Sequence, residues 1–262
     1  MKAQLTLTPA EGKRLIAKAV ANMENVQYAY KNGTLIIATS TTTAYIVEEL
    51  TGKQIPDKGM FTAGVVTKEG AGITTADGRY DHYVYAQGEL KECSTPQLVP
   101  YLASMGPDDV FIKGANAIDP FGSAGILMHG SGGGTIGTAL GHILRNGIQY
   151  IIPVGLEKTV PISLTDASMR LGANTIDKAM GWPCGMMVVQ GQVITEMEAF
   201  KLLFGVDAIP VAAGGIDGGE GCRVFLVEGG TENVEAAYEL VQSIKGEPEL
   251  KTKLSKKPAT LA

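Results

Sequence analysis

Cysteine is scarce in this chain, and its three copies lie far apart, at Cys93, Cys184 and Cys222, with no CxxC spacing. Such isolated cysteines are typical of reduced thiols rather than of a disulfide framework or a zinc site. The sequence also lacks a His/Cys/Asp cluster, a GxSxG motif and a Gly-Lys-Ser/Thr phosphate loop. We therefore expect no bound metal and no cofactor, and no hydrolase of the GxSxG type.

Basic residues, aromatic residues and long apolar runs are also few. The formal net charge is −5 and no basic stripe is present, so nucleic acid is not an expected partner. No apolar run reaches the roughly 18 residues that span a bilayer, and the first residues lack the apolar core of a signal peptide. These absences predict a cytoplasmic protein with no membrane partner. The basic stretch Lys251 to Lys257 is interpreted as a solvated tail.

What the chain does contain is enough apolar sequence for a large core. Hydrophobic residues make up 45% of 262 residues and charged residues 19%, which is typical of a globular protein with one large domain or one domain and a small appendage. The 34 glycines cluster at the ends of predicted strands. That clustering favours tight turns and close approach of the backbone to a ligand.

Three short apolar runs in the stretch 107–161 predict the main sheet. They cover residues 110–112, 126–128 and 150–154, and a segment with helical patterning separates the last two. Short apolar runs with a helical crossover are typical of buried parallel strands. We therefore predict an α/β fold with a mostly parallel open sheet and helices on both faces, with ligands bound at the carboxyl ends of its strands.

Local signals place further elements. The segment Thr8-Pro9-Ala10-Glu11 is a capping box with proline at the first helical position, and residues 34–38 are a predicted strand. A helix is expected within 161–179. A second capping box at 195–198 opens a helix–strand–strand–helix pattern, so we predict an α/β domain over 1–194 and a small α+β unit over 195–262. The glycine-rich residues 214–221 are interpreted as a hairpin rather than a site.

Two loops are candidates for binding an anion. Hydroxyl residues 39–43 lie between a strand and a helix, where free backbone N–H groups converge, although plain helix capping explains them equally well. Glycines at 130–134 open a second helix, and close helix–strand packing is the alternative there. The predicted ligand-binding residues are Thr39, Ser40, Thr41, Thr42, Lys113, Asn116, Gly130, Ser131, Gly132, Gly133, Gly134 and Thr135.

Charged groups at strand ends are candidates for chemistry. Lys113 follows a buried strand, where an ammonium needs either an anionic ligand or an internal partner such as Asp119. Asn116 and Asp119 suit sugar hydroxyls, and turn formation or helix capping is their structural alternative. His129, Glu157 and Asp119 are the candidate catalytic residues, with a surface ion pair between Glu157 and Lys158 as the alternative for that carboxylate.

Several of these segments carry a family resemblance. Residues 34–43 followed by 45–50, and residues 109–119 followed by a glycine loop, resemble the superfamily of ribose-5-phosphate isomerase, sugar-phosphate-sensing regulator domains and CoA transferases. The segment 153–161 is similar to the lactate-utilisation branch of that superfamily. The resemblance spans roughly residues 10–165, and it depends on the order and spacing of the motifs.

The resemblance implies a function, but one residue of this sequence departs from the family's catalytic pattern. It implies binding of a small phosphorylated or otherwise anionic metabolite with isomerase-like proton transfer next to a carbonyl. The position of the isomerase's catalytic glutamate is Ala117 here, and a methyl group accepts no proton. Two alternatives stay open: a non-catalytic metabolite sensor, and acyl transfer of the CoA transferase kind. We also expect a homo-oligomer.

Overall fold

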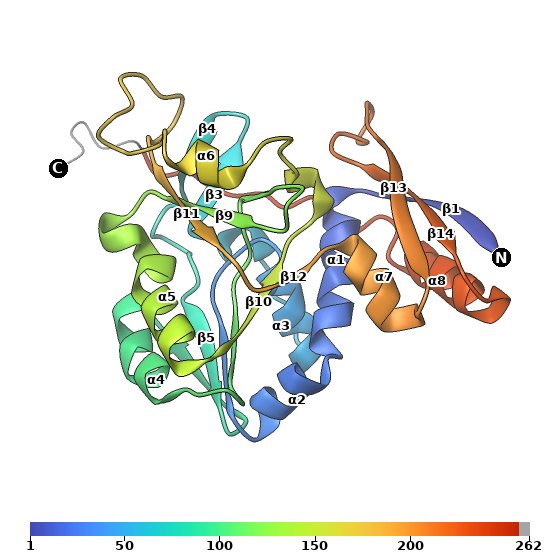
Figure 1. Ribbon diagram of the computed structural model, residues 1–262, viewed down its shortest axis with the longest axis horizontal. Coiled ribbons are helices and arrows are strands. Elements are labelled where there is room, and N and C mark those ends of the chain that lie inside the picture. The colour runs from blue at the N-terminus through green and yellow to red at the C-terminus, as the bar shows by residue number, and fades with distance from the viewer. Residues whose placement is uncertain (257–262) are drawn as a thin grey trace.

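The computed structural model describes residues 1–256, and its largest element is a mixed six-stranded sheet (Figure 1). In spatial order the strands are β12 (Gln192–Ile194), β10 (Gln149–Pro153), β7 (Val110–Ile112), β2 (Thr34–Ile37), β5 (His82–Ala86) and β6 (Glu89–Cys93). The first four run parallel, and β5 and β6 complete the edge as an antiparallel pair. The prediction of an α/β fold with a mostly parallel main sheet is confirmed to this extent.

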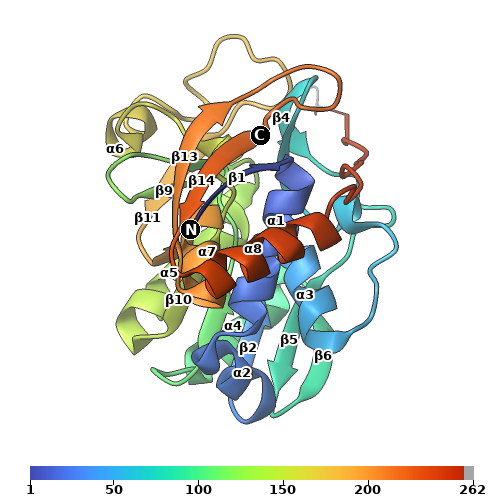
Figure 2. The same ribbon diagram turned by 90° about the vertical axis from the view of Figure 1, so that its right-hand side faces the viewer.

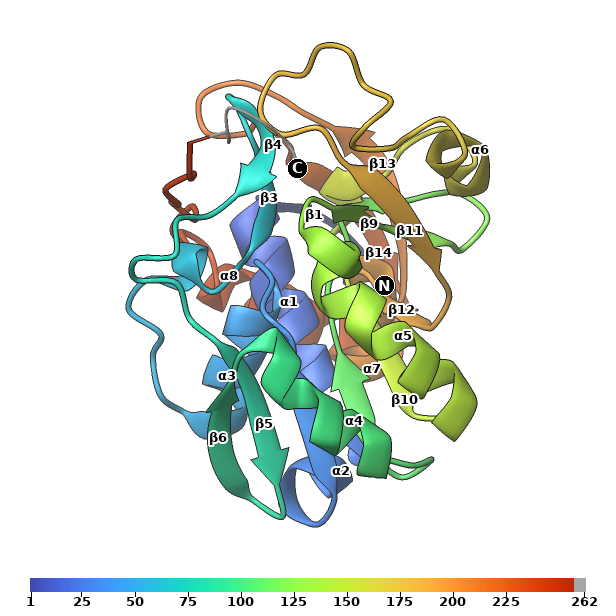
Figure 3. The same cartoon turned by 90° about the vertical axis from the view of Figure 1, so that its left-hand side faces the viewer.

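Helices cover both faces of this sheet. Successive side chains of a strand point to opposite faces, so each face of these apolar strands is buried against its own helices. Leu35 and Ile37 belong to one hydrophobic cluster, whereas Ile36 and Phe111 belong to the other. The first cluster includes α1 (Pro9–Ala21), α2 (Glu24–Lys31), α3 (Thr43–Thr51) and α7 (Glu196–Phe204), which face the viewer in Figure 2. The second includes α4 (Val99–Ser104) and α5 (Gly134–Asn146), which face the viewer in Figure 3.

Both predicted capping boxes are present. Thr8 accepts a hydrogen bond from the Glu11 amide (3.2 Å), and the Glu11 carboxylate accepts one from the Thr8 amide (2.9 Å). Thr195 and Glu198 are paired in the same reciprocal way at the start of α7. Each box satisfies backbone donors that a helix start otherwise leaves without partners. None of the helices in residues 1–256 is long and apolar enough to cross a membrane.

A second, three-stranded antiparallel sheet combines the two ends of the chain. Its order is β1 (Lys2–Leu7), β14 (Arg223–Glu228) and β13 (Asp207–Ala213), and it packs with α7 and α8 (Thr231–Ser243) (Figure 1). Its central strand contributes Phe225 to the same hydrophobic cluster as α1. The predicted unit 195–262 thus takes a third strand from residues 2–7, a strand that the sequence did not reveal, and its residues 257–262 lie outside the described part.

The apolar run 126–128 is not a strand of the main sheet, and this prediction was wrong. It belongs to β9 (Ala124–Met128), which lies antiparallel between β8 (Ala117–Ile118) and β11 (Gly185–Val189). The turn that reverses the chain is held by Asp119, whose Oδ1 accepts hydrogen bonds from the amides of Phe121 (3.0 Å) and Ser123 (2.9 Å). A chain reversed within so few residues pairs with its own preceding strand.

The helix predicted within 161–179 is shorter than expected. Only α6 (Leu164–Ser168) forms, capped by Ser163, and the chain then continues through turns to a short bridge at Gly181. Gly172 and Asn174, both weak helix formers, follow soon after α6. A separate hairpin, β3 (Gly64–Thr67) and β4 (Gly70–Ile73), lies above the carboxyl ends of the parallel strands (Figure 1).

Candidate functional site

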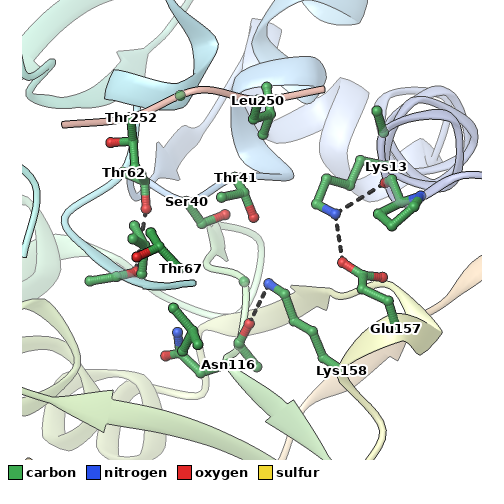
Figure 4. A pocket seen from close by; sticks show the side chains of 18 of the residues that line it. Lys13, Ser40, Thr41, Thr62, Thr67, Asn116, Glu157, Lys158, Leu250 and Thr252 are labelled. Atoms are coloured by element: carbon green, nitrogen blue, oxygen red, sulfur yellow. Dashed lines mark hydrogen bonds and ion pairs between the residues drawn. The ribbon is translucent and has the colours of Figure 1, made fainter. Parts of the chain in front are cut away.

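A cavity of about 950 Å³ lies where β2, β7 and β10 end. Because these strands are parallel neighbours, the segments that follow them meet at one edge of the sheet. Figure 4 shows side chains from these segments directed toward a common space. The lining residues that follow the three strands are Thr39, Ser40, Thr41, Lys113, Gly114, Ala115, Asn116, Glu157, Lys158, Thr159 and Val160.

Three lysines line this cavity, and two of them are engaged by protein groups. Lys13 of α1 forms an ion pair with Glu157 (2.5 Å) and donates to the carbonyl of Pro9 (3.0 Å). Lys158 donates to the carbonyl of Ala115 (2.8 Å). Lys113 forms no side-chain hydrogen bond and no ion pair with any residue of the described chain. Among residues 1–256, Lys113 is therefore the lysine of the cavity lining that has no protein partner.

The environment lowers the basicity of two of these lysines. Burial lowers the pKa of Lys113 to about 8, and the nearby charge of Lys158 acts in the same direction. Burial likewise lowers the pKa of Lys158 to about 8, although Glu157 partly opposes it. Desolvation and a like charge both disfavour the protonated form. An anion in the cavity would favour the protonated form and so raise the pKa of both Lys113 and Lys158.

Two neighbouring carboxylates, Glu157 in the cavity lining and Glu196 outside it, have pKa values shifted in opposite directions. Burial would raise the pKa of Glu157, but Lys13 and Lys158 outweigh it and keep that pKa below its usual range. Its Oε2 atom is buried and has no hydrogen-bond partner among the described residues. Burial, and then the charge of Glu157, raise the pKa of Glu196 to about 7, while its carboxylate accepts from the Leu156 amide (2.9 Å).

In the hydroxyl loop, residues 39–43, some hydroxyls cap helix α3 and others line the cavity. Ser40 Oγ accepts from the amide of Thr43 (3.2 Å), and the Thr43 hydroxyl donates to the carbonyl of Ala38 (2.8 Å). These two side chains cap the N-terminus of α3. Thr41 lines the cavity, and its buried hydroxyl has no partner among the described residues; Thr42 is fully buried and does not line it. The capping interpretation thus holds for Ser40 and Thr43, and Thr41 stays a candidate for ligand binding.

His82, which was not among the predicted site residues, joins the two predicted loops behind the cavity. Its Nδ1 accepts a hydrogen bond from the Thr39 amide (3.0 Å), and its Nε2 lies 3.0 Å from the Thr95 hydroxyl and 3.1 Å from that of Thr135. Burial, followed by the charges of Lys113 and Arg79, lowers the pKa of His82 to about 3. The ring is therefore neutral, and the acceptor role of Nδ1 places its proton on Nε2.

The glycine loop does not reach the cavity. Gly130, Ser131 and Gly132 are exposed, and none of the residues 130–135 is among those that line it. The left-handed backbone of Gly132, Gly133 and Gly134 instead forms a surface turn that opens α5. Thr135 of this loop is linked to residues 39–43 indirectly: its hydroxyl contacts Nε2 of His82, and Nδ1 of the same ring accepts from the Thr39 amide.

The three candidate catalytic residues lie in different surroundings. Glu157 lines the cavity, whereas Asp119 and His129 do not. Both carboxylate oxygens of Asp119 accept backbone hydrogen bonds, one of them from Leu164 (3.0 Å), so its role is to hold a turn. The ring of His129 lies beside Gly64, and burial lowers its pKa. Asn116 lines the cavity and uses its side-chain oxygen to bind the Leu127 amide (3.0 Å).

One wall of the cavity was not predicted from the sequence, and it is formed by the last part of the described chain. Glu247, Glu249, Leu250 and Thr252 line it, and Figure 4 shows the labelled Leu250 and Thr252 across from Lys158. The residues that follow are anchored by hydrogen bonds between Thr75 and Lys253 (2.8 Å) and between Ser255 and Ile73 (2.8 Å). We call residues 247–255 the C-terminal strap.

The interpretation of residues 251–257 as a solvated tail was therefore wrong for 251–255, and Lys257 lies outside the described residues. Nothing in the periodicity of this extended segment signals its position, because backbone hydrogen bonds to distant loops hold it. The glycine-rich loop 214–221 also contributes Gly218 and Glu220 to the lining, although it was interpreted as a hairpin rather than a site.

Gly59 is expected to be required for docking of the strap. A Cβ atom at this position would overlap the carbonyl oxygen of Lys251, which is backbone and cannot rotate away. Gly59→Ala should therefore loosen the strap and raise the rate of trypsin cleavage after Lys251 and Lys253 on the order of tenfold, the equivalent of about 1.4 kcal/mol. Gly106→Ala, where a Cβ meets open space, is the matched control. Equal cleavage of both variants would contradict a docked strap.

Comparison with known proteins adds no family to this description. No protein-family model matches the sequence, and no curated protein is similar to it. Among residues 1–256, no group of three or more His, Cys, Asp and Glu side chains is arranged to hold a metal ion. The class that fold and site define is a mixed α/β protein with a lysine-lined cavity at the carboxyl ends of its parallel strands.

Proposed function

We propose that the protein binds a small anionic metabolite, of the size of a phosphorylated sugar, in this cavity. The observation that carries the proposal is Lys113, a partly buried lysine of the cavity lining that forms no hydrogen bond or ion pair with the described chain and lies near a second lysine. Such an arrangement costs free energy unless a negative charge meets it. An anionic ligand supplies that charge.

The rest of the lining suits the polar part of such a ligand. The side-chain amide nitrogen of Asn116 and the hydroxyls of Ser40 and Thr41 lie at the same strand ends as Lys113. Amide and hydroxyl groups both bind sugar hydroxyls and phosphate oxygens. The cavity volume is also within the range of sites that enclose small metabolites, about 300–1,000 Å³.

We further propose isomerase-like proton transfer, with Glu157 as the group that accepts the proton. Ala117 lies in β8 and contributes no acid or base, so the reaction needs a different carboxylate. Glu157 is ionised at neutral pH and has one oxygen without a hydrogen-bond partner among the described residues. The resemblance to ribose-5-phosphate isomerase supports this reaction class by analogy only.

Calorimetric titration tests the binding proposal. Ribose 5-phosphate should bind the wild-type protein measurably, and uncharged ribose should not. Lys113→Gln should weaken binding of the phosphate about 10- to 100-fold, because a charge-assisted contact contributes about 1.5–3 kcal/mol. Lys201→Gln, at an exposed ion pair, should leave it unchanged. Equal affinity for ribose, or no loss in Lys113→Gln, would contradict the proposal.

Solvent exchange then distinguishes an enzyme from a sensor. If Glu157 moves a proton, deuterium from D₂O should enter the carbon next to the carbonyl of bound sugar phosphate, and Glu157→Gln should slow this about 10²–10⁴-fold. Binding without exchange would instead favour the non-catalytic sensor. Trapping of a glutamyl thioester after treatment with an acyl-CoA would favour the acyl-transfer alternative.

A further inference from the structure

We propose that Lys113 acts as a nucleophile that forms an imine with the ligand, so the substrate class is an aldehyde or ketone that also carries a phosphate or carboxylate. This inference rests on the proposed function, because it concerns the same cavity. It goes beyond that function by assigning a covalent step and a second required group on the ligand.

The contacts of the three cavity lysines single out Lys113. Lys13 is held by Glu157 and by the Pro9 carbonyl, and Lys158 is held by the Ala115 carbonyl. The Lys113 amino group has no hydrogen-bond acceptor in residues 1–256. It also lies directly after β7, a fully buried central strand, so its Cα position is fixed by the sheet. A nucleophile needs a free lone pair at a fixed place, and only Lys113 of these three lysines has both.

The charges around Lys113 keep part of it in the neutral form. Lys158 is the charged group that acts on it, and His82, whose pKa the charge of Lys113 helps to lower, is neutral. Because burial and Lys158 lower the pKa of Lys113 to about 8, about a tenth of it is unprotonated near pH 7. An ordinary surface lysine, with a pKa of about 10.4, is unprotonated to less than about a thousandth. A lysine made less basic by burial and a second cation is the usual source of an imine-forming amine.

The step balances without any further reactant. The neutral Lys113 nitrogen attacks the carbonyl carbon and gives up one of its two protons, and the carbonyl oxygen takes up one proton, which yields a carbinolamine. The hydroxyl of the carbinolamine takes up one more proton from solvent and leaves as water, while the nitrogen keeps its remaining proton and its lone pair forms the second C–N bond of an iminium ion. The positive nitrogen acidifies the neighbouring C–H bond, and the ionised Glu157 in the cavity lining is the acceptor for that proton. Hydrolysis by the reverse route releases Lys113.

Reductive trapping tests the assignment. Wild-type protein is incubated with glyceraldehyde 3-phosphate near pH 7 and borohydride is added, which converts an imine into a stable secondary amine. Peptide mass spectrometry should locate the adduct on Lys113, formed at least about tenfold faster than on exposed lysines such as Lys201. Lys158→Met should slow trapping severalfold near pH 7 and leave it unchanged near pH 10, because it removes the charge that lowers the basicity of Lys113.

The outcomes separate this inference from the proposed function. Adduct spread evenly over surface lysines, or undiminished in Lys113→Arg, would overturn the inference. Glycerol 3-phosphate, which has no carbonyl, is titrated in parallel. If it binds but no Lys113 adduct forms, the imine is excluded and anion binding stands. If neither glycerol 3-phosphate nor ribose 5-phosphate binds, the proposed function is overturned as well.

Discussion

Replacing Arg14 by methionine should lower the free energy of unfolding by about 3–5 kcal/mol, the range observed when one partner of a buried ion pair is removed. The Arg14 guanidinium contacts Glu48 (2.5 Å), Glu49 (2.8 Å) and Glu247 (2.9 Å), and it stacks over the ring of Tyr45 at 4.6 Å. The side chain of Glu48 is only 1% exposed, so its carboxylate would lose its closest charge without gaining water. Urea unfolding followed by circular dichroism measures the change.

The matched control is Lys201→Met. Lys201 pairs with Asp207 at 3.0 Å, but both side chains are more than half exposed, and such pairs contribute about 0–1 kcal/mol. If the two variants lose equal stability, the Arg14 cluster does not act as a buried ion network. Because Glu247 begins the C-terminal strap, Arg14→Met should also increase trypsin cleavage after Lys251, as Gly59→Ala does.

Glu196 should make the protein less stable as the pH rises from about 4.5 to about 7. Its pKa is about 7 in the folded protein, against an ordinary value of 4.5 for a glutamate in water, so the folded state holds a proton that the unfolded state has lost. The free energy of unfolding then falls with pH across this window. Glu196→Gln removes the titration, and it should be more stable than wild type by about 3 kcal/mol near pH 8.

The groups that face Glu196 are Glu157, Lys13 and Lys158, and the Leu156 amide can still donate to the glutamine side chain. The advantage of Glu196→Gln should shrink toward pH 4, where both proteins carry a neutral group at this position. Thermal unfolding over the pH range measures it, with the exposed Glu235→Gln as control. An advantage that does not vary with pH would mean that Glu196 is already ionised.

Local signals predicted the helices with caps and the strands of the sheet centre. The boxes at Thr8 and Thr195 involve only neighbouring residues, and the apolar runs at 110–112 and 150–154 are buried on both faces. By contrast, β1 forms because it pairs with β14, more than 200 residues away in the chain. Pairings at that separation leave no periodic pattern in sequence. The direction of β9 was likewise set by a turn, not by its own composition.

The candidate site was predictable where it follows the parallel strands. Ser40, Lys113 and Glu157 each come soon after such a strand, and the sheet brings them to one cavity. The glycine loop follows β9, which lies outside the main sheet, so its residues open at the surface instead. The partnership of Lys13 with Glu157 could not be read from sequence, because it depends on how α1 lies against the end of β10.

The pairing of β1 with β14 has a consequence for biosynthesis. On the ribosome, residues 2–7 emerge more than 200 residues ahead of their partner, residues 223–228. At about 5–20 residues per second, β1 waits roughly 10–40 s for that partner. For most of this interval, until α7 is made, the α1 surface that α7 covers in the finished protein is also bare. The nascent chain therefore presents an unpaired strand and the apolar face of α1 to chaperones until β14 is made.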